Sequence, residues 1–303
     1  MKQLFIKAVL LLLFLLLIDL LAGRLLYYLY SKSNNGIAFQ EFYIVNKTTE
    51  DVLVLGSSRA AYHYVPEVIE NEVGLKVYNA GREGTGKFFQ YGVLLAIIDR
   101  YKPKKIILDF DYREIYKQGG FDRKDLDQLR PFYGRISGQF DALLADTWYK
   151  RLLYRFNLVK YNKKVFHILT GYVFEGRDNM NGFRPLYGKR MDPTGSLQTE
   201  NMEVSSEKVE IIRSLLELAL ENNIDVVLVV SPYCKYVPEN FMEPLENLAK
   251  EYDLPLLNFI NDTTFLNRPY LFFNDELHLN ETGALKFSGK VAHEILTSCT
   301  VDM

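Results

Sequence analysis

Two distant stretches of the chain carry side chains that together could attack an ester. Residues 56–59, Gly-Ser-Ser-Arg, follow an apolar run and place the Ser58 hydroxyl at a turn where backbone N–H groups can stabilise an oxyanion. Near the C-terminus Asp275 precedes His278 by three residues, and a carboxylate at this spacing can orient an imidazole. An imidazole held in this way can take the proton from a serine hydroxyl. Ser58, His278 and Asp275 therefore form a candidate triad for nucleophilic acyl chemistry.

A third stretch, residues 79–84 (Asn-Ala-Gly-Arg-Glu-Gly), could complete the site. Its glycines permit close backbone approach, so the N–H groups of Gly81 and Ser58 are the predicted oxyanion hole. Neighbouring side chains at the same edge are expected to line the pocket, namely Ser57, Arg59, Asn79, Asp111, Tyr112 and Tyr233. No pattern predicts a metal site or a cofactor.

The elements that must position these residues alternate between strands and helices. Short apolar runs predict strands at 51–55, 75–78, 105–108, 225–230 and 254–257. Helical patterns lie near 64–73, 84–101, 205–223, 238–252 and 281–298. This alternation predicts an α/β fold with a parallel sheet covered on both faces, and ligands bind at the carboxyl edge of such sheets.

In order and separation these motifs resemble those of the SGNH/GDSL hydrolase superfamily, over about residues 51–298. The resemblance implies a flavodoxin-like three-layer α/β/α sandwich, with Ser58 as nucleophile and Asp275 and His278 completing the triad. The usual Gly-Asp-Ser has Ser57 at its second position here, as in membrane-anchored members that move acyl groups onto cell-envelope polymers.

The third block of the family departs further. Residues 109–112 read Asp-Phe-Asp-Tyr where the family usually has Gly-x-Asn-Asp, so the Asn donor to the oxyanion is missing. Losing one such donor typically costs about 10²–10³ in rate. Tyr112, or a residue of the segment that follows, is the predicted substitute.

The N-terminus predicts an uncleaved transmembrane anchor over residues 1–30. Residues 8–18 are unbroken apolar, and the apolar character continues past Asp19 towards a Tyr-Tyr pair at 27–28. Lys2 and Lys7 favour a cytoplasmic N-terminus, which makes the chain a single-pass protein of the cytoplasmic membrane with an extracytoplasmic catalytic domain. Asp19 is read as the outer boundary, where it can reach headgroups or pair with Arg24.

Residues 31–50 are predicted to be a linker and lead-in, and 51–303 the α/β domain with an insertion at about 113–205 that lies over the sheet. The insertion is rich in aromatic and basic residues, and either a solvated helical cap or a substrate-binding lid fits this pattern. The net charge of −2 excludes a basic nucleic-acid-binding protein. Cys234 and Cys299 are too few for a disulfide framework, and whether they pair stays open.

The sequence thus predicts a membrane-anchored esterase or O-acyltransferase of serine type. Its expected substrate is an acyl ester, most simply acetyl, of an extracytoplasmic polysaccharide or envelope polymer, and a membrane acyl-donor protein is a candidate partner. Two alternatives remain. One is a degenerate domain that binds polymer or a membrane partner without catalysis. The other is a nucleotide hydrolase, because residues 81–87 almost spell a phosphate-binding loop, although Phe88 replaces the magnesium-binding hydroxyl.

Overall fold

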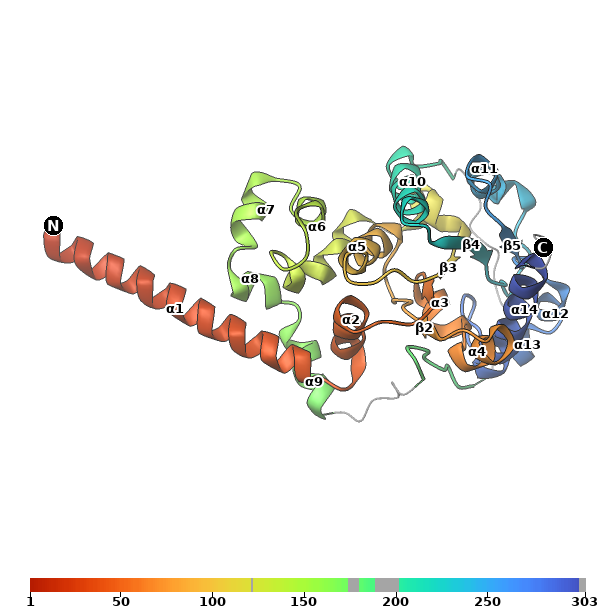
Figure 1. Ribbon diagram of the computed structural model, residues 1–303, viewed down its shortest axis with the longest axis horizontal. Helices are drawn as coiled ribbons and strands as arrows, with labels where there is room; N and C mark the ends of the chain where they lie inside the picture. The colour runs from red at the N-terminus through yellow and green to blue at the C-terminus, as the bar shows by residue number, and fades with distance from the viewer. Residues whose placement is uncertain (121, 174–179, 189–201, 300–303) are drawn as a thin grey trace. The chain divides into compact units, whose positions relative to one another are not determined.

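A computed structural model describes the chain except for residues 121, 174–179, 189–201 and 300–303 (Figure 1). The chain divides into two compact units. The N-terminal unit comprises Met1–Lys47 and Leu126–Gly176, and the α/β unit comprises Thr48–Asp125 and Arg177–Met303. Every residue predicted for the catalytic site falls in the α/β unit.

The α/β unit is built on a five-stranded parallel sheet with the order β2-β1-β3-β4-β5. Its strands are β1 Val52–Leu55, β2 Val77–Asn79, β3 Lys105–Asp109, β4 Asp225–Val230 and β5 Leu256–Asn258. All of β1 is buried, as expected for a strand covered on both faces. The strand order reverses between β1 and β3, which creates a crevice at their carboxyl ends. The predicted flavodoxin-like parallel sheet is therefore confirmed.

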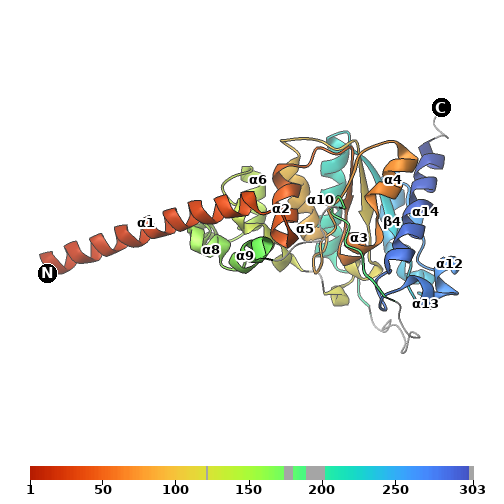
Figure 2. The ribbon, with the colours of Figure 1, turned by 90° about the horizontal axis from the view of Figure 1, so that it is seen from below.

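Helices cover both faces of this sheet, as the two perpendicular views show (Figures 1 and 2). On one face α14 packs against α3 and α4, and on the other α5 packs against α10. The α-helices of the unit are α3 Ser58–His63, α4 Pro66–Val73, α5 Lys87–Ile97, α10 Ser206–Glu221, α11 Glu243–Glu251, α12 Thr263–Leu266, α13 Pro269–Phe272 and α14 Glu281–Cys299. Short 3₁₀ helices lie at η1 Tyr112–Ile115, η2 Lys117–Gly119 and η4 Glu239–Phe241, and η3 Arg123–Phe132 runs across the boundary of the two units.

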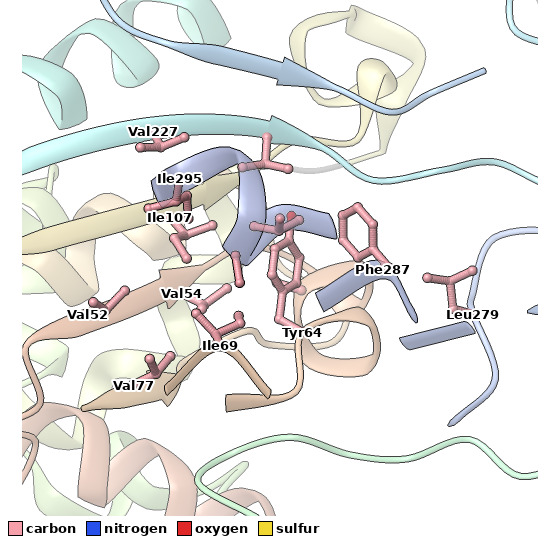
Figure 3. Close-up of a cluster of buried hydrophobic side chains, with 14 of the residues drawn as sticks. Val52, Val54, Tyr64, Ile69, Val77, Ile107, Val227, Leu279, Phe287 and Ile295 are labelled. Carbon is pink, nitrogen blue, oxygen red and sulfur yellow. The ribbon is translucent and has the colours of Figure 1, made fainter. Parts of the chain in front are cut away.

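The main core of the α/β unit lies between the sheet and the α4–α14 face (Figure 3). Val52 and Val54 of β1 and Ile107 of β3 present their side chains to this layer. Phe287 of α14 is fully buried there, and its ring contacts those of Tyr64, Phe259 and Phe265 as well as the His63 imidazole. The core therefore joins the sheet to the segment that follows Ser58.

The predicted helix near 64–73 corresponds to α4, and a separate short helix, α3, precedes it. α3 begins at Ser58 and ends at His63, Tyr64 and Val65 are extended, and α4 begins at Pro66. Proline is favoured at the first position of a helix and biases the preceding residue away from the helical conformation, so Pro66 explains the break. As a result the predicted nucleophile lies at the first position of a short helix.

The N-terminal unit is helical throughout its described residues. Its helices are α1 Lys2–Lys32, α2 Gly36–Asn46, α6 Gly138–Leu144, α7 Trp148–Leu153, α8 Asn157–Tyr161 and α9 Val165–Val173. Within the predicted linker and lead-in at 31–50, residues 36–46 form α2. This helix is held by a buried ion pair between Glu41 and Lys164 and by the Tyr30 hydroxyl, which donates to Glu41. The contacts are distant in sequence, so the local pattern did not reveal them.

α1 is the one helix among the described residues that is long and apolar enough to cross a membrane. Most of its side chains are exposed, but Asp19 and Gly23 are buried against α8. The Asp19 carboxylate accepts hydrogen bonds from the backbone N–H groups of Asn157 and Leu158 and from the Asn157 side chain. Asp19 therefore pairs with the first turn of α8 rather than with Arg24 or with lipid headgroups.

The aromatic core gives a test of stability. Replacing Phe287 by Ala removes a fully buried ring and should lower the free energy of unfolding by about 3–5 kcal/mol. Leu285→Ala is the matched control, because Leu285 is on the same helix and 45% exposed. Thermal unfolding of the detergent-solubilised full chain, followed by circular dichroism, measures both. Equal losses in the two variants would contradict the packing described.

Candidate active site

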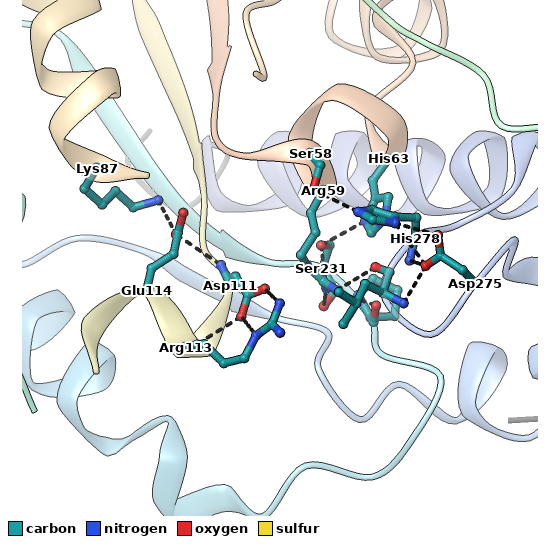
Figure 4. Close-up of polar contacts among 12 residues, drawn as sticks. Ser58, Arg59, His63, Lys87, Asp111, Arg113, Glu114, Ser231, Asp275 and His278 are labelled. Carbon is teal, nitrogen blue, oxygen red and sulfur yellow. Dashed lines mark hydrogen bonds and ion pairs between the residues drawn. The ribbon is translucent and has the colours of Figure 1, made fainter. Parts of the chain in front are cut away.

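The structure brings Ser58, His278 and Asp275 together beyond the carboxyl end of β1 (Figure 4). The Ser58 Oγ lies 2.8 Å from His278 Nε2. His278 Nδ1 lies 2.8 and 2.9 Å from the two carboxylate oxygens of Asp275. An ionised carboxylate can only accept, so Nδ1 carries the ring proton and donates to Asp275. Nε2 is then the acceptor for the Ser58 hydroxyl, which is the arrangement a general base requires.

The Asp275 carboxylate is held in its ionised form. Partial burial acts to raise its pKa, but hydrogen bonds from the His278 ring and from the N–H groups of Leu277 and His278 outweigh it and lower the pKa below its usual value. The same contacts fix the short loop, because Asp275 binds both the backbone and the ring of His278. The three-residue spacing thus makes a locally closed carboxylate–imidazole pair.

Arg59, one residue after Ser58, is buried and ties three segments together. Its guanidinium donates to the Leu277 carbonyl, to the carbonyl and hydroxyl of Ser231, and to the Pro232 carbonyl. It also lies 3.8 Å from the centre of the Tyr233 ring. Leu277 precedes His278, and Ser231 follows β4. Arg59 therefore positions the nucleophile helix against the loop that carries the base, and is not exposed to a substrate.

His63, at the other end of α3, also links α3 to other segments by hydrogen bonds, and the sequence did not predict this role. Its Nε2 accepts the Leu279 backbone N–H at 2.9 Å, so the ring proton must be on Nδ1, 3.0 Å from the Ser231 hydroxyl. Burial, followed by the charge of Arg59, lowers the pKa of His63 well below its usual value. The imidazole therefore stays neutral and holds Leu279 next to the predicted base. In the sequence, the position of His63 five residues after Ser58 was the only feature that pointed to a role near the site.

The two predicted oxyanion donors, the N–H groups of Ser58 and Gly81, differ in their hydrogen bonding. The Ser58 N–H is at the start of α3 and has no acceptor in the described part of the chain. The Gly81 N–H instead donates to the Asn79 Oδ1 at 2.9 Å. Gly81 is needed for close packing, because a Cβ there would lie 2.3 Å from the Ala61 nitrogen.

The same loop offers other N–H groups for the oxyanion. Within the described residues, the N–H groups of Glu83 and Gly84 have no acceptor, and Gly84 is exposed with a φ of +65°. Both polar atoms of the Asn79 side chain are hydrogen-bonded, because Oδ1 accepts the Gly81 N–H and Nδ2 donates to the carbonyls of Ala60 and Tyr64. Asn79 is thus a structural support for the loop rather than a pocket residue.

The third block does not supply a donor. Asp111 is fully buried and forms a two-point ion pair with Arg113. Burial acts against this charge, but Arg113 lowers the Asp111 pKa well below its usual value. Tyr112 is buried too, with its ring against Tyr233 and Phe241. The side chains predicted at 111, 112 and 233 therefore form the wall behind the site.

The phosphate-loop alternative does not fit the geometry. Lys87 begins α5, but its side chain is only 2% exposed and lies 2.6 Å from a carboxylate oxygen of Glu114. Its ammonium also donates to the Asp109 carbonyl. A phosphate-binding lysine must reach the ligand, whereas this one is buried and paired. Asp109 accepts the Tyr64 hydroxyl and is likewise turned inward.

The triad is accessible from solvent. The side chain of His278 is 17% exposed and that of Asp275 is 51% exposed. Tyr62 places its ring edge-on to His278 at 5.0 Å, and an ion pair of 2.7 Å joins Glu83 to Arg184. Tyr62 also bonds Glu83, so these residues form a polar and aromatic rim beside the base. A cavity of about 650 Å³ lies elsewhere, lined by residues of β5, α11 and the loop to α12.

Cys234 contributes another contact between the same loops. Its sulfur lies 3.1 Å from the Glu276 carbonyl oxygen, and the neighbouring Lys235 lies 3.4 Å from the Glu276 carboxylate. The side chain of Cys299 is outside the described residues, so whether Cys234 and Cys299 form a disulfide stays open.

Comparison with known proteins finds likeness only among solved structures. No family model matches the sequence, and no curated protein matches it. The structure is similar to that of a protein described as lipolytic and of the G-D-S-L family from Desulfitobacterium hafniense, at 12% identity with a TM-score of 0.39, covering 80% of this chain and 98% of that one. It is similar to a lipase/acylhydrolase from Enterococcus faecalis at 10% identity and a TM-score of 0.41, covering 80% and 94%.

A third similar structure, of a protein from Lactobacillus plantarum, has 12% identity and a TM-score of 0.42, covering 83% of this chain and 98% of that one.

The neutral, buried state of His63 predicts a pH dependence of stability. The unfolded chain protonates His63 below its ordinary pKa of 6.5, whereas the folded chain does not. The free energy of unfolding therefore falls as the pH drops below that value, by up to about 1.4 kcal/mol per pH unit. We expect His63→Gln to reduce this acid sensitivity, measured by denaturant unfolding at a series of pH values. His293→Gln, at an exposed site on α14, is the control, and an unchanged slope in His63→Gln would contradict the assignment.

Proposed function

We propose that the chain is a membrane-anchored serine esterase or O-acyltransferase. The observation that carries the proposal is the continuous line of hydrogen bonds from Ser58 through His278 to Asp275, at an accessible point on the carboxyl edge of a parallel sheet. In α/β sheets of this kind ligands bind at that edge, next to the reversal of strand order. The low-identity likeness to GDSL-type structures is compatible with this chemistry.

The geometry supports a two-step acyl transfer. His278 Nε2 removes the proton of the Ser58 hydroxyl as the oxygen attacks the ester carbonyl carbon. Asp275 stabilises the imidazolium that forms, and the ring then returns its proton to the departing alcohol. In the second step water or a sugar hydroxyl, deprotonated by the same nitrogen, attacks the acyl carbon. The bond from this carbon to the Ser58 oxygen breaks, His278 returns the proton to that oxygen, and the acid or the new sugar ester leaves.

Negative charge that develops on the carbonyl oxygen needs N–H donors. The Ser58 N–H meets this need, because it begins a helix and has no acceptor in the described part of the chain. The second donor in our proposal comes from Glu83 or Gly84, since the Gly81 N–H is bound to Asn79. No Asn side chain takes part, in keeping with the altered third block.

The proposed substrate is an acyl ester, most simply an acetyl ester, of an extracytoplasmic polysaccharide or related envelope polymer. An open triad suits an ester carried on a bulky polymer better than a small molecule that must be enclosed. The aromatic and charged rim of Tyr62, Glu83 and Arg184 offers a stacking face and hydrogen-bonding groups for sugars. The apolar helix α1, which has Lys2 and Lys7 near its start, would hold the enzyme at the outer face of the cytoplasmic membrane, where a membrane acyl-donor protein could supply acyl groups.

A second candidate function is a binding domain without catalysis. Two observations favour it, namely the loss of the third-block Asn and the engagement of the Gly81 N–H by Asn79. Such a domain would bind acylated polymer or a membrane partner at the same edge. The two functions differ in whether the Ser58 hydroxyl is activated.

Labelling of the full chain with a fluorophosphonate probe tests the activated serine. The wild type should label, and Ser58→Ala and His278→Ala should abolish labelling and acetyl-ester turnover. Ser57→Ala is the matched control, because Ser57 is adjacent and buried, and its side chain makes no capping hydrogen bond. A folded wild type that neither labels nor turns over ester would support the binding domain instead.

Asp275→Asn tests the role of the carboxylate. An amide cannot stabilise the imidazolium and favours the wrong ring tautomer, so kcat for acetyl-ester turnover should fall about 10³–10⁴-fold. KM should change little, because Asp275 does not contact the ester in the proposed mechanism. Glu276→Gln is the control in the same loop, and a comparable loss of kcat there would contradict the assignment.

A further inference from the structure

The N-terminal unit exposes large apolar side chains on α7 and α8, and α8 packs on α1. Six of them form what we term the α7–α8 surface, consisting of Trp148, Tyr149, Leu152, Leu153, Phe156 and Leu158. Trp148 is the most exposed, at 77%. Soluble proteins rarely expose so many large apolar side chains in one short stretch, and such a patch marks an interaction surface.

The position of Asp19 sets the depth of this surface. If the hydrocarbon layer begins near Lys7, Asp19 lies about 18 Å further along α1 at about 1.5 Å per residue, well within a layer of about 30 Å. A carboxylate at that depth needs partners, and Asp19 finds them in the N–H groups that begin α8. The start of α8 is therefore at the same depth as Asp19.

Packing along α1 agrees with this depth. α8 packs directly on α1, and Gly23 makes room for Asn157, since a Cβ there would lie 2.3 Å from the Asn157 side chain. α9 meets α1 further on, where the Tyr172 hydroxyl contacts the Leu29 carbonyl and Gly171 packs against Ser33. In Figure 1, α7 runs crosswise to α1.

The charges of this stretch favour a lipid surface. Residues 148–164 contain six basic residues and no acidic residue, and of these six Lys160 and Lys164 are buried, with Lys164 paired to Glu41. Arg151, Arg155 and Lys163 are exposed among the apolar side chains. Tryptophan, tyrosine and basic residues together are the composition of helices that lie in a membrane interface, where the rings reach the acyl boundary and the cations meet phosphates.

We propose that the α7–α8 surface lies in the lipid leaflet around the outer half of α1, so that the N-terminal unit is seated in the membrane. This inference rests on the membrane anchoring that is part of the proposed function. It adds that anchoring involves a surface contributed by residues more than a hundred positions from the spanning helix. The partner is the bilayer itself, through both its acyl chains and its anionic headgroups.

Trp148 provides the test, because it is the only tryptophan of the chain. The full chain is reconstituted in vesicles of phosphatidylcholine and phosphatidylglycerol, with or without bromine on the lipid acyl chains. We expect a blue-shifted Trp148 emission, loss of most of that emission with brominated lipid, and little quenching by aqueous acrylamide. Flotation of the vesicles measures anchoring by α1 in the same samples.

The double variant Trp148→Phe, Tyr270→Trp is the matched control, with the tryptophan at a site in the α/β unit that is 50% exposed. Its emission should be quenched by acrylamide and not by brominated lipid. Acrylamide quenching of Trp148 without bromine quenching, in chains that float, would overturn the inference and leave the anchor intact. Protection from both quenchers would also overturn it, by assigning the surface to a protein contact. Chains that do not float would remove the anchor and this inference together, while labelling of Ser58 is measured independently.

Discussion

The geometry of the site depends on the buried guanidinium of Arg59. It donates to three carbonyl and hydroxyl groups around Ser231 and to the Leu277 carbonyl, and so links α3, the turn after β4 and the loop before α14. Both terminal nitrogens of this buried cation are hydrogen-bonded, and their acceptors would be left unpaired without it, so Arg59 favours one arrangement of the three segments. That arrangement sets Ser58 at hydrogen-bond distance from His278. His63 repeats the principle with a neutral ring at the other end of α3.

The neighbouring edge of the sheet shows how charge is balanced when it is buried. Behind the triad, Asp111 pairs with Arg113 and Glu114 pairs with Lys87, all close to the end of β3. Buried ion pairs contribute little net stability, but breaking one leaves an uncompensated charge. These pairs therefore hold the acidic residues of the third block inside the protein. In the proposed mechanism, the backbone N–H groups of Ser58 and of the 83–84 turn then stabilise the oxyanion.

In the N-terminal unit, a buried carboxylate on an apolar helix is likewise satisfied by hydrogen bonds from a segment distant in sequence. A carboxylate within an apolar helix is costly in lipid, and the first turn of α8 has N–H groups that no helix can satisfy internally. Asp19 and the first turn of α8 satisfy one another, which links α8 to α1. The apolar and basic exterior of α7 and α8 is then consistent with a lipid environment rather than with water.

The features that depend on local spacing could be predicted from the sequence alone. Apolar runs predicted the strands, and the three-residue step from Asp275 to His278 predicted a carboxylate–imidazole pair, because both ends lie in one short loop. The fold class followed from the alternation of helices and strands. Contacts between segments far apart in the sequence are visible only in the folded structure. Examples are Ser58 with His278 across 220 positions, Asp19 with α8, and Lys87 with Glu114. The tertiary structure also turned the Gly81 N–H towards Asn79 and joined α2 to α9. These outcomes depend on which polar groups are left unsatisfied once the core has packed, and that is a property of the folded chain rather than of any local pattern.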